Sequence, residues 1–242
     1  KRMKTEEMAI IENREVAKDT YLLILGGFLE AQPGQFCSLS IPGLFLRRPL
    51  GIVANDGKRL SFLYKVVGEG TLALSRMKKG GKLDVFGPLG HGFEDRKNDS
   101  LLVSAGLGIA PILFLAKTMK KEGKIFHLVC CFNSKSDIPL MEELKSLDPS
   151  ITIVTLDGSV GIKGIFKDGL KDGESRKTCY CCGPLPFMKA CEEHFSDGYL
   201  SLECRMGCGY GICNGCTLLS KDGKRKKICK DGPVFAFKEV EY

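Results

Sequence analysis

The sequence predicts a β barrel followed by an α/β domain and a small C-terminal subdomain that is rich in cysteine. Short strand-like segments occupy residues 8–93, strand-like and helix-like segments alternate from residue 99 onward, and four closely spaced cysteines lie near the C-terminus. Each pattern is typical of a different architecture. We therefore place three domains at residues 1–97, 98–200 and 201–242.

The first domain reads as a small antiparallel barrel. Its short apolar segments are separated by the turn sequences PGQ, NDGK and KGGK, and one helical pattern interrupts them at residues 71–79. Many short strands with Gly and Pro between them are typical of such barrels. The expected strands are residues 8–17, 20–27, 35–41, 59–67 and 82–90.

The second domain reads as a doubly wound parallel sheet, because strands and helices alternate along it. Ligands of such sheets bind at the carboxyl ends of the strands. The expected strands are residues 101–105, 125–132, 151–157 and 178–183, and the expected helices are residues 110–123, 139–147, 166–172 and 185–195.

Four cysteines predict a 2Fe-2S cluster in the third domain. Cys208, Cys213, Cys216 and Cys229 follow the spacing C-x4-C-x2-C…C, which is the plant-type arrangement of cluster ligands. A four-cysteine zinc site is the alternative, but it usually has two separate C-x2-C pairs and this run has one. Cys204 lies outside the spacing, and we expect it to be a small buried side chain.

Three expected strand ends carry small residues that suit a dinucleotide. A G-x-G turn alone is often only a tight connection, but three such loops at one edge of a sheet predict a nucleotide site. The residues are Gly106 and Gly108, then Asp157 and Gly158, then Cys182, Gly183 and Pro184.

The barrel half carries two groups that suit a flavin dinucleotide. The run LRRPLGI, expected to end a strand, offers an arginine whose planar guanidinium can clamp a phosphate. Gly68, Gly70 and Thr71 lie at the start of the expected helix, where backbone N–H groups receive anions.

Composition excludes several other classes of protein. The formal net charge is +7, and residues 204–231 hold seven Lys or Arg against two Asp, beside the expected anionic cofactors. Nucleic-acid binding is therefore a poor inference. No segment is apolar for the roughly 20 residues of a membrane span, and the N-terminus is too charged for a signal peptide. We expect a cytoplasmic protein with no membrane partner and with reduced thiols.

These motifs resemble those of the ferredoxin reductase family of flavoproteins over nearly the whole chain. The R-P pair, G-x-G-T before a helix, G-x-G-x-A-P and C-G-P all match. The ending ECRMGCGYGICNGC…CKDGPVF, and the order of barrel, nucleotide domain and cluster, resemble the electron-transfer subunits of class 1B dihydroorotate dehydrogenases. The resemblance implies an FAD-binding barrel, an NAD-binding domain and a 2Fe-2S subdomain.

The resemblance also implies roles for single residues. The family's R-P-x-S flavin motif falls on Arg48, Pro49, Leu50 and Gly51, with Arg48 on the pyrophosphate. Gly51 replaces the usual Ser or Thr, so no side-chain hydroxyl can bond flavin N5 there. Cys182 would lie near nicotinamide and flavin. The remaining implied flavin residues are Leu63, Tyr64, Lys65, Gly70 and Thr71.

The implied function is electron transfer in pyrimidine biosynthesis. A separate FMN-containing catalytic subunit would oxidise dihydroorotate, and the electrons would cross the cluster and FAD to NAD+, in a heterotetramer of two subunits of each kind. No catalytic acid or base is evident, since the three histidines are isolated in sequence. NAD(H) is favoured over NADP(H), because Lys135 is the only cation after the second strand and Asp137 is close to it.

Two other functions fit the same residues. The chain could serve an NAD(P)H-ferredoxin, sulfide-linked or hydrogenase reductase complex, because such subunits share the reductase halves and an appended cluster. It could also be a zinc-stabilised module with a vestigial or regulatory nucleotide site. The colour of the purified protein separates these, since flavin and iron–sulfur protein is yellow-brown.

Overall fold

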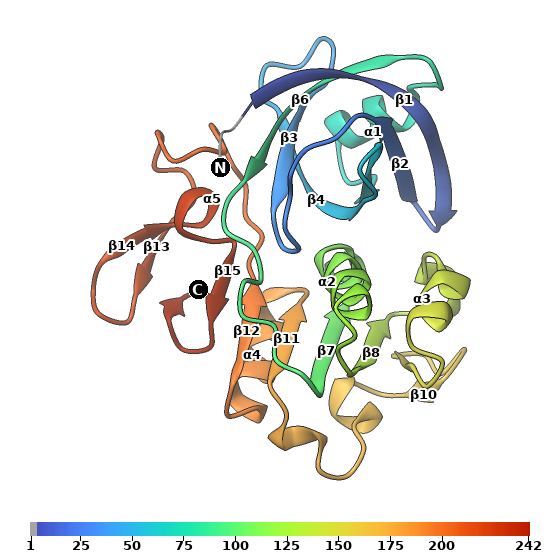
Figure 1. Ribbon diagram of the computed structural model, residues 1–242, viewed down its shortest axis with the longest axis vertical. Helices are drawn as coiled ribbons and strands as arrows, with labels where there is room; N and C mark the ends of the chain where they lie inside the picture. Colours follow the sequence, from blue (N-terminus) through green and yellow to red (C-terminus); the bar gives the residue numbers. More distant parts are fainter. Residues whose placement is uncertain (1–3) are drawn as a thin grey trace.

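The N-terminal half forms the predicted antiparallel barrel, which closes with six strands rather than the five ranges expected. The computed structural model describes residues 4–242, and the barrel order is β1-β2-β5-β4-β3-β6 (Figure 1). A short helix, α1 (Glu69–Ser75), lies between the last two strands in sequence. The strands are β1 (Lys4–Ala17), β2 (Thr20–Gly26), β3 (Phe36–Ser40), β4 (Arg48–Asn55), β5 (Arg59–Lys65) and β6 (Lys82–Leu89).

Arg48 begins strand β4, so the expectation that LRRPLGI ends a strand is wrong. Arg48 pairs with Leu39, and Pro49 pairs with Ser38, at the start of the β3–β4 ladder. Proline is tolerated at the beginning of a strand, where its missing N–H costs little pairing. The following residues pack into the barrel, with Ile52 fully buried.

The second half forms a seven-stranded sheet in the order β10-β9-β8-β7-β11-β12-β15. Neighbours from β10 to β12 are parallel, and alternate residues of the central strands enter two different apolar cores. Both faces are therefore covered, which confirms the doubly wound prediction. The strands are β7 (Ser100–Ala105), β8 (Phe126–Phe132), β9 (Thr152–Thr155), β10 (Ile162–Lys163), β11 (Cys179–Cys182), β12 (Gly198–Ser201) and β15 (Val234–Ala236).

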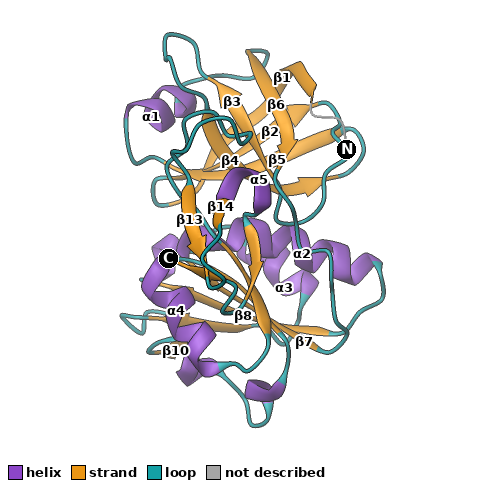
Figure 2. Cartoon of the chain, turned by 90° about the vertical axis from the view of Figure 1, so that its left-hand side faces the viewer, coloured by secondary structure: helices purple, strands orange, loops and turns teal. Residues whose placement is uncertain are grey.

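Helices cover the two faces of this sheet. Figure 2 shows α2 and α3 on the side of the barrel and α4 on the opposite side. The expected helix at 166–172 is only a short 3-10 turn, η3 (Phe166–Gly169). The helical elements are η1 (Gly106–Gly108), α2 (Ile109–Lys121), η2 (Lys135–Asp137), α3 (Met141–Leu147), η4 (Glu174–Arg176), α4 (Leu185–His194) and α5 (Ile228–Asp231).

Helix α2 joins the barrel to the sheet. It is apolar almost all round, and it packs on β4 of the barrel as well as on β7 (Figure 1). One continuous core therefore contains Leu22 and Val53 from the barrel and Ile112 and Leu128 from the α/β half. This shared core fixes the two halves against each other and positions the pockets between them.

The C-terminal segment returns to the sheet after it forms the cysteine loop. Strand β15 pairs antiparallel with β12, and neither strand was expected from the sequence. The rest forms a three-stranded sheet of β13 (Thr217–Ser220), β14 (Arg225–Lys227) and β16 (Val240–Glu241). In residues 4–242, no helix has the length and apolar character needed to cross a membrane.

Candidate functional site

Arg48 and Gly70, both predicted flavin residues, are in direct contact. A Cβ atom on Gly70 would lie 2.1 Å from Nε of Arg48. Gly68 precedes α1, and the Thr71 hydroxyl accepts the Val67 N–H at 2.9 Å, so this hydroxyl holds the first turn of the helix. The guanidinium therefore lies beside the start of α1, where cationic and backbone donors can converge on a phosphate.

A cavity of about 140 Å³ lies between the barrel, α2 and the segment that leads to the cysteine loop. Its barrel wall holds Pro49, Leu50 and Gly51 of β4 and Leu63 of β5. We name this space the inter-domain pocket. A side chain on Gly51 would meet only Pro111 Cδ at 3.9 Å, so the pocket is open at this residue. The other walls are formed by Gly34, Phe36, Leu107, Ala110, Pro111, Ser201, Leu202, Glu203, Cys204, Met206 and Pro233.

Successive side chains of strand β5 point to different parts of the molecule. Leu63 lines the inter-domain pocket, and Lys65 lines a second pocket on the sheet. Tyr64, between them, points into the barrel, where its hydroxyl lies 2.8 Å from Asn13 Oδ1 and its ring stacks on Tyr21. Because strand side chains alternate, Tyr64 can reach a flavin only through its backbone.

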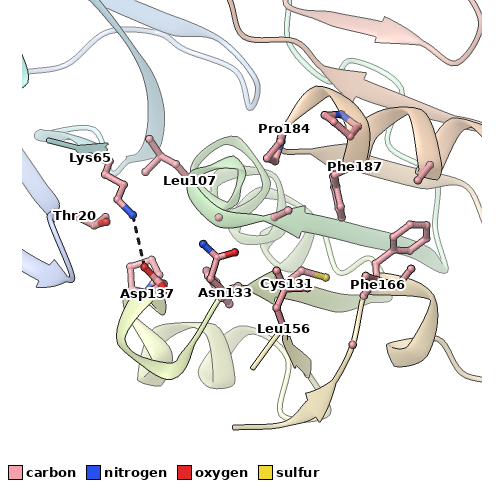
Figure 3. A pocket seen from close by; sticks show the side chains of 18 residues that line it. Thr20, Lys65, Leu107, Cys131, Asn133, Asp137, Leu156, Phe166, Pro184 and Phe187 are labelled. Carbon is pink, nitrogen blue, oxygen red and sulfur yellow. Dashed lines mark ion pairs between the residues drawn. The ribbon is translucent and has the colours of Figure 1, made fainter. Parts of the chain in front are cut away.

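The second pocket, of about 410 Å³, lies at the carboxyl ends of the parallel strands (Figure 3). We name it the strand-end pocket. At one end Lys65 forms an ion pair with Asp137, with Nζ and Oδ1 3.6 Å apart. At the other end the rings of Phe166 and Phe187 pack edge to face, with centroids 5.6 Å apart. Its mainly apolar lining suits a flat organic ligand.

The predicted glycine loops lie at the carboxyl ends of the parallel strands, but only some of their residues line the strand-end pocket. Gly106, with φ +54°, and Pro184 line the strand-end pocket. Gly108 instead allows close packing, since its Cβ would lie 2.2 Å from the Cys182 carbonyl oxygen. Gly183 is packed in the same manner, with Phe187 Cδ1 2.7 Å from a hypothetical Cβ. These two glycines hold the turns after β7 and β11 together.

Two predicted residues have side chains outside the pocket lining. Asp157 accepts hydrogen bonds from the Ser159 side chain and backbone, which lower the pKa of its carboxyl group. Gly158 follows with φ +76°, so the pair forms a tight turn after β9. The Cys182 thiol is buried and donates to the Ser201 carbonyl at 3.3 Å. Cys182 lines neither pocket, but its hydrogen-bond partner Ser201 lines the inter-domain pocket.

The four predicted cluster ligands form two pairs. Cys208 and Cys213 exchange backbone N–H···S bonds of 3.5 and 3.3 Å, and the sulfurs of Cys216 and Cys229 lie 3.2 Å apart. Burial would raise the pKa of Cys208, but surrounding backbone N–H donors outweigh it and lower this pKa to about 6. Two pairs suit a 2Fe-2S cluster, in which each iron takes two protein ligands, and within residues 4–242 no three His, Cys, Asp or Glu side chains lie close enough to share one metal ion.

The loop that carries these cysteines is held against the barrel. A Cβ on Gly209 would lie 2.9 Å from Ser38 Oγ of β3, and Tyr210 packs edge to face on Phe86 of β6. Lys227 Nζ donates to the Gly211 carbonyl at 2.6 Å, so a cation at the end of β14 supports the loop directly. The loop is thus fixed close to the strand that neighbours β4.

The sequence reasoning missed several residues of the two pockets. Asn133 directly follows β8 at the same sheet edge as the predicted loops, so its place after a strand was a usable signal. Glu203 and Met206 enter the inter-domain pocket from an irregular segment. No periodic pattern marks them, because their position depends on β12, which was not expected.

Comparison of the sequence with known proteins identifies a matching family model and relatives that align over nearly the whole chain. A sequence model of the iron–sulfur cluster binding domain of dihydroorotate dehydrogenase B matches residues 203–241. The dihydroorotate dehydrogenase B (NAD(+)) electron transfer subunit of Fusobacterium nucleatum is 38% identical, over 99% of both chains. The same subunit of Geobacillus sp. (strain WCH70) is 37% identical, over 98% of this chain and 99% of the relative.

Solved structures agree with this result. A chain of an NADH-dependent reduced ferredoxin-NADP oxidoreductase, described with flavin-based electron bifurcation, superposes with a TM-score of 0.87 at 30% identity and covers 97% of this chain and 90% of its own. The flavohemoglobin of Malassezia yamatoensis, at 19% identity and a TM-score of 0.70, covers 78% of this chain and 56% of its own, and it shares the fold alone. The predicted resemblance is confirmed, and this chain belongs to the family of electron transfer subunits of dihydroorotate dehydrogenase B (NAD(+)).

Proposed function

We propose that this chain carries electrons between a dihydroorotate-oxidising partner subunit and NAD+, using one FAD and one 2Fe-2S cluster. The observation that carries the proposal is the position of the inter-domain pocket. Segment 203–206, which leads to the cysteine loop, lines this pocket on one side, and Leu107 lines both it and the strand-end pocket. The three predicted cofactor sites are therefore consecutive neighbours.

The protein's part is to bind and orient the cofactors. Flavin exchanges one or two electrons, an iron–sulfur cluster exchanges one, and nicotinamide exchanges a hydride. Arg48 would hold the flavin pyrophosphate beside α1, and the β4 and β5 walls of the inter-domain pocket would receive the flavin ring. Cys208, Cys213, Cys216 and Cys229 would hold the cluster.

The strand-end pocket would hold NAD. Its apolar floor and the packed rings of Phe166 and Phe187 offer a surface for the flat bases. The Lys65–Asp137 ion pair joins the barrel to η2 at the other end, so the pocket is closed there by both halves of the chain (Figure 3). We place NAD here because this is the ligand edge of a doubly wound sheet.

The partner is a catalytic subunit, as the family of electron transfer subunits requires. We propose an FMN-containing dihydroorotate dehydrogenase subunit, assembled as a heterotetramer of two subunits of each kind. The exposed residues Tyr210 and Ile212 of the cysteine loop would contact it. A cluster at this surface would bring the one-electron carrier close to the partner's flavin.

Reconstitution tests the proposal. The anaerobically purified chain should contain two iron and two sulfide per FAD, reduce a dye with NADH, and fail to oxidise dihydroorotate. Adding the catalytic subunit should produce dihydroorotate-dependent reduction of NAD+. Zinc in place of iron, or orotate formation by this chain alone, would contradict the proposal.

A ferredoxin-linked reductase is the second candidate, favoured by the 30% identical chain of the ferredoxin-NADP oxidoreductase. The two functions differ in the partner that accepts or supplies single electrons. Reduction of ferredoxin by NADH with this chain, and no response to the dihydroorotate dehydrogenase subunit, would favour the second candidate.

A further inference from the structure

Lys65 brings a positive charge from the barrel into the strand-end pocket. It is the last residue of β5 and lies directly opposite Thr20 of β2, which also lines this pocket. Within residues 4–242 the lining contains two charged side chains, Lys65 and Asp137, among mostly apolar ones (Figure 3). The sequence resemblance assigned Lys65 to the flavin, whereas its side chain lines the pocket proposed for NAD.

The end of the barrel that carries Lys65 rests on η2. The Lys18 N–H donates to the Ser136 carbonyl at 2.9 Å, so the β1–β2 turn is tied to η2. The Val66 N–H donates to the Asp19 carbonyl at 2.8 Å, so the residue after Lys65 is tied to the same turn. The backbone of Lys65 is therefore fixed at the pocket. Its side chain is 39% exposed and ends in a flexible stem, so the ammonium group can change partner.

The ion pair between Lys65 and Asp137 is open to exchange. Nζ and Oδ1 are 3.6 Å apart, which is longer than a normal N–H···O hydrogen bond. The second carboxylate oxygen of Asp137, Oδ2, accepts the Ser134 hydroxyl at 2.8 Å, so the carboxylate keeps a partner when Lys65 moves. Ion pairs of exposed lysines also add little stability. Transfer of Lys65 to another anion therefore costs the protein little.

A dinucleotide brings two negative charges of its pyrophosphate to a pocket whose own two charges cancel. Burial of a charge is costly unless the charge is paired. Among residues 4–242, Lys65 is the one cationic side chain in the lining, so it is the group that can pair with a phosphate there. The turn after β7 leaves room for such a ligand, because a Cβ on Gly106 would meet nothing within 4 Å.

We propose that Lys65 binds the pyrophosphate of NAD, and that it exchanges its partner Asp137 for this group when the dinucleotide enters the strand-end pocket. The inference rests on the proposed function. Asp137 holds the ammonium group at the pocket in the free protein, and a phosphate oxygen accepts its hydrogen bond in the complex. No covalent bond changes, and the ammonium group keeps its proton. Since Lys65 belongs to the barrel, the bound dinucleotide then links the two halves of the chain.

Titration calorimetry of the cofactor-loaded protein with ADP-ribose tests this exchange. ADP-ribose contains the pyrophosphate and lacks the nicotinamide, so its binding is measured without electron transfer. Lys65→Met removes the charge and keeps a stem of similar length, and Lys65→Arg keeps a cation. Lys135→Met is the matched control, because Lys135 belongs to η2, like Asp137, but lies outside the pocket lining. Flavin absorbance and circular dichroism of each variant report FAD content and folding.

We expect Lys65→Met to bind ADP-ribose about tenfold more weakly, as for the loss of one charge-assisted hydrogen bond, and to keep its FAD. Lys65→Arg and Lys135→Met should stay near wild type. Unchanged affinity in Lys65→Met would overturn the inference, and so would an equal loss in Lys135→Met, which would indicate a general effect of charge. Loss of FAD from Lys65→Met would assign Lys65 to the flavin instead.

Asp137→Asn tests the exchange itself. If Asp137 competes for Lys65, its neutralisation should tighten ADP-ribose binding, and the gain should be smaller when Lys65→Met is also present. Weaker binding in Asp137→Asn would show that the ion pair stays intact in the complex, and the exchange would be refuted. Wild-type protein that binds no ADP-ribose would instead contradict the NAD site of the proposed function.

Discussion

The guanidinium of Arg48 occupies the space in which a side chain on Gly70 would lie. A Cβ on Gly70 would be 2.1 Å from Nε and 2.7 Å from Cζ of Arg48, well below any normal contact. Gly70 lies 22 positions after Arg48, in α1, while Arg48 begins β4. The contact explains why an arginine and a glycine so far apart in sequence belong to one predicted phosphate site.

Gly70→Ala should displace Arg48 and weaken FAD binding. The added methyl group displaces the guanidinium, and because this is the far end of a flexible side chain the loss falls on the phosphate contact rather than on the fold. We expect less bound flavin after purification and little change in the melting temperature of the flavin-free protein, since Ala is a better helix former than Gly. Gly68→Ala is the control, because its Cβ would meet nothing within 4 Å and its φ is extended. Equal flavin content in both variants would contradict the assigned role of Arg48.

Gly51→Ser should be tolerated and should alter the flavin rather than the fold. The nearest atom to a new Cβ is Pro111 Cδ at 3.9 Å, an ordinary contact. The variant restores the hydroxyl of the related flavin motif inside the inter-domain pocket. We expect unchanged flavin content with a shifted flavin potential, measured by spectroscopic redox titration. Loss of flavin would show that the pocket needs glycine for close approach.

The fold was predictable where local patterns determine it. The barrel strands and the alternating strands and helices follow from periodicity and turn residues, and the parallel sheet follows from their alternation. Strand β12 was missed because GYLS is short and lies only a few residues after α4. Strand β15 was missed for another reason: it joins the sheet from beyond the cysteine loop, and such a long-range pairing leaves no local pattern.

The sequence motifs identified the residues of the sites but not the directions in which their side chains point. Spacing alone identified the four cysteines, and the structure brings them together as two pairs. Tyr64 points into the barrel because strand residues alternate, which the motif could not indicate. Lys227 supports the Gly211 carbonyl rather than serving only as a surface charge. Charge reversal at Lys227 would therefore disturb the cysteine loop itself.

Asp137 should contribute to a preference for NADH over NADPH. Its carboxylate lines the strand-end pocket, whereas Lys135 does not. Among residues 4–242, the one cation in the pocket lining is Lys65, which is paired with Asp137 and so is not free for a 2′-phosphate. We expect wild type to have the higher kcat/KM with NADH in dye reduction. Asp137→Asn should reduce the ratio of kcat/KM for NADH to kcat/KM for NADPH by about fivefold. The substitution removes roughly 1 kcal/mol of repulsion between the carboxylate and the 2′-phosphate of NADPH. A wild-type preference for NADPH would overturn this assignment.

Cys213→Ser should lose the cluster. The substitution removes one thiolate of the Cys208–Cys213 pair and with it a constraint on the loop. We expect iron and labile sulfide to fall severely while flavin is retained, because the flavin residues lie on the barrel. Cys204→Ser is the control and should keep its iron. If Cys204→Ser loses iron while Cys208→Ser keeps it, the first ligand is Cys204.

A buried charged cluster lies at the amino-terminal edge of the parallel sheet, away from both pockets. Asp148 lies 3.0 Å from His127 Nδ1 and accepts the Leu128 N–H at 2.8 Å and the Ser150 hydroxyl at 2.7 Å. Glu174 faces the other side of the imidazole at 4.0 Å from Nε2. Burial would raise the pKa of Asp148, but the hydrogen bonds from His127, Leu128 and Ser150 outweigh it and hold this pKa well below its ordinary value of 3.8.

Asp148→Asn should therefore destabilise the protein at neutral pH and progressively less in acid. A carboxyl group whose pKa is lower in the folded state contributes stability above its unfolded pKa and loses it as the pH falls toward the folded value. At pH 7 we expect a loss of about 2 kcal/mol from the broken charged hydrogen bonds. Thermal unfolding of both proteins, followed by circular dichroism from pH 7 to about pH 3, checks this, because the ordinary pKa of Asp lies within that range. A difference in melting temperature that stays constant down to the acid end would show that Asp148 acts by packing rather than by its charge.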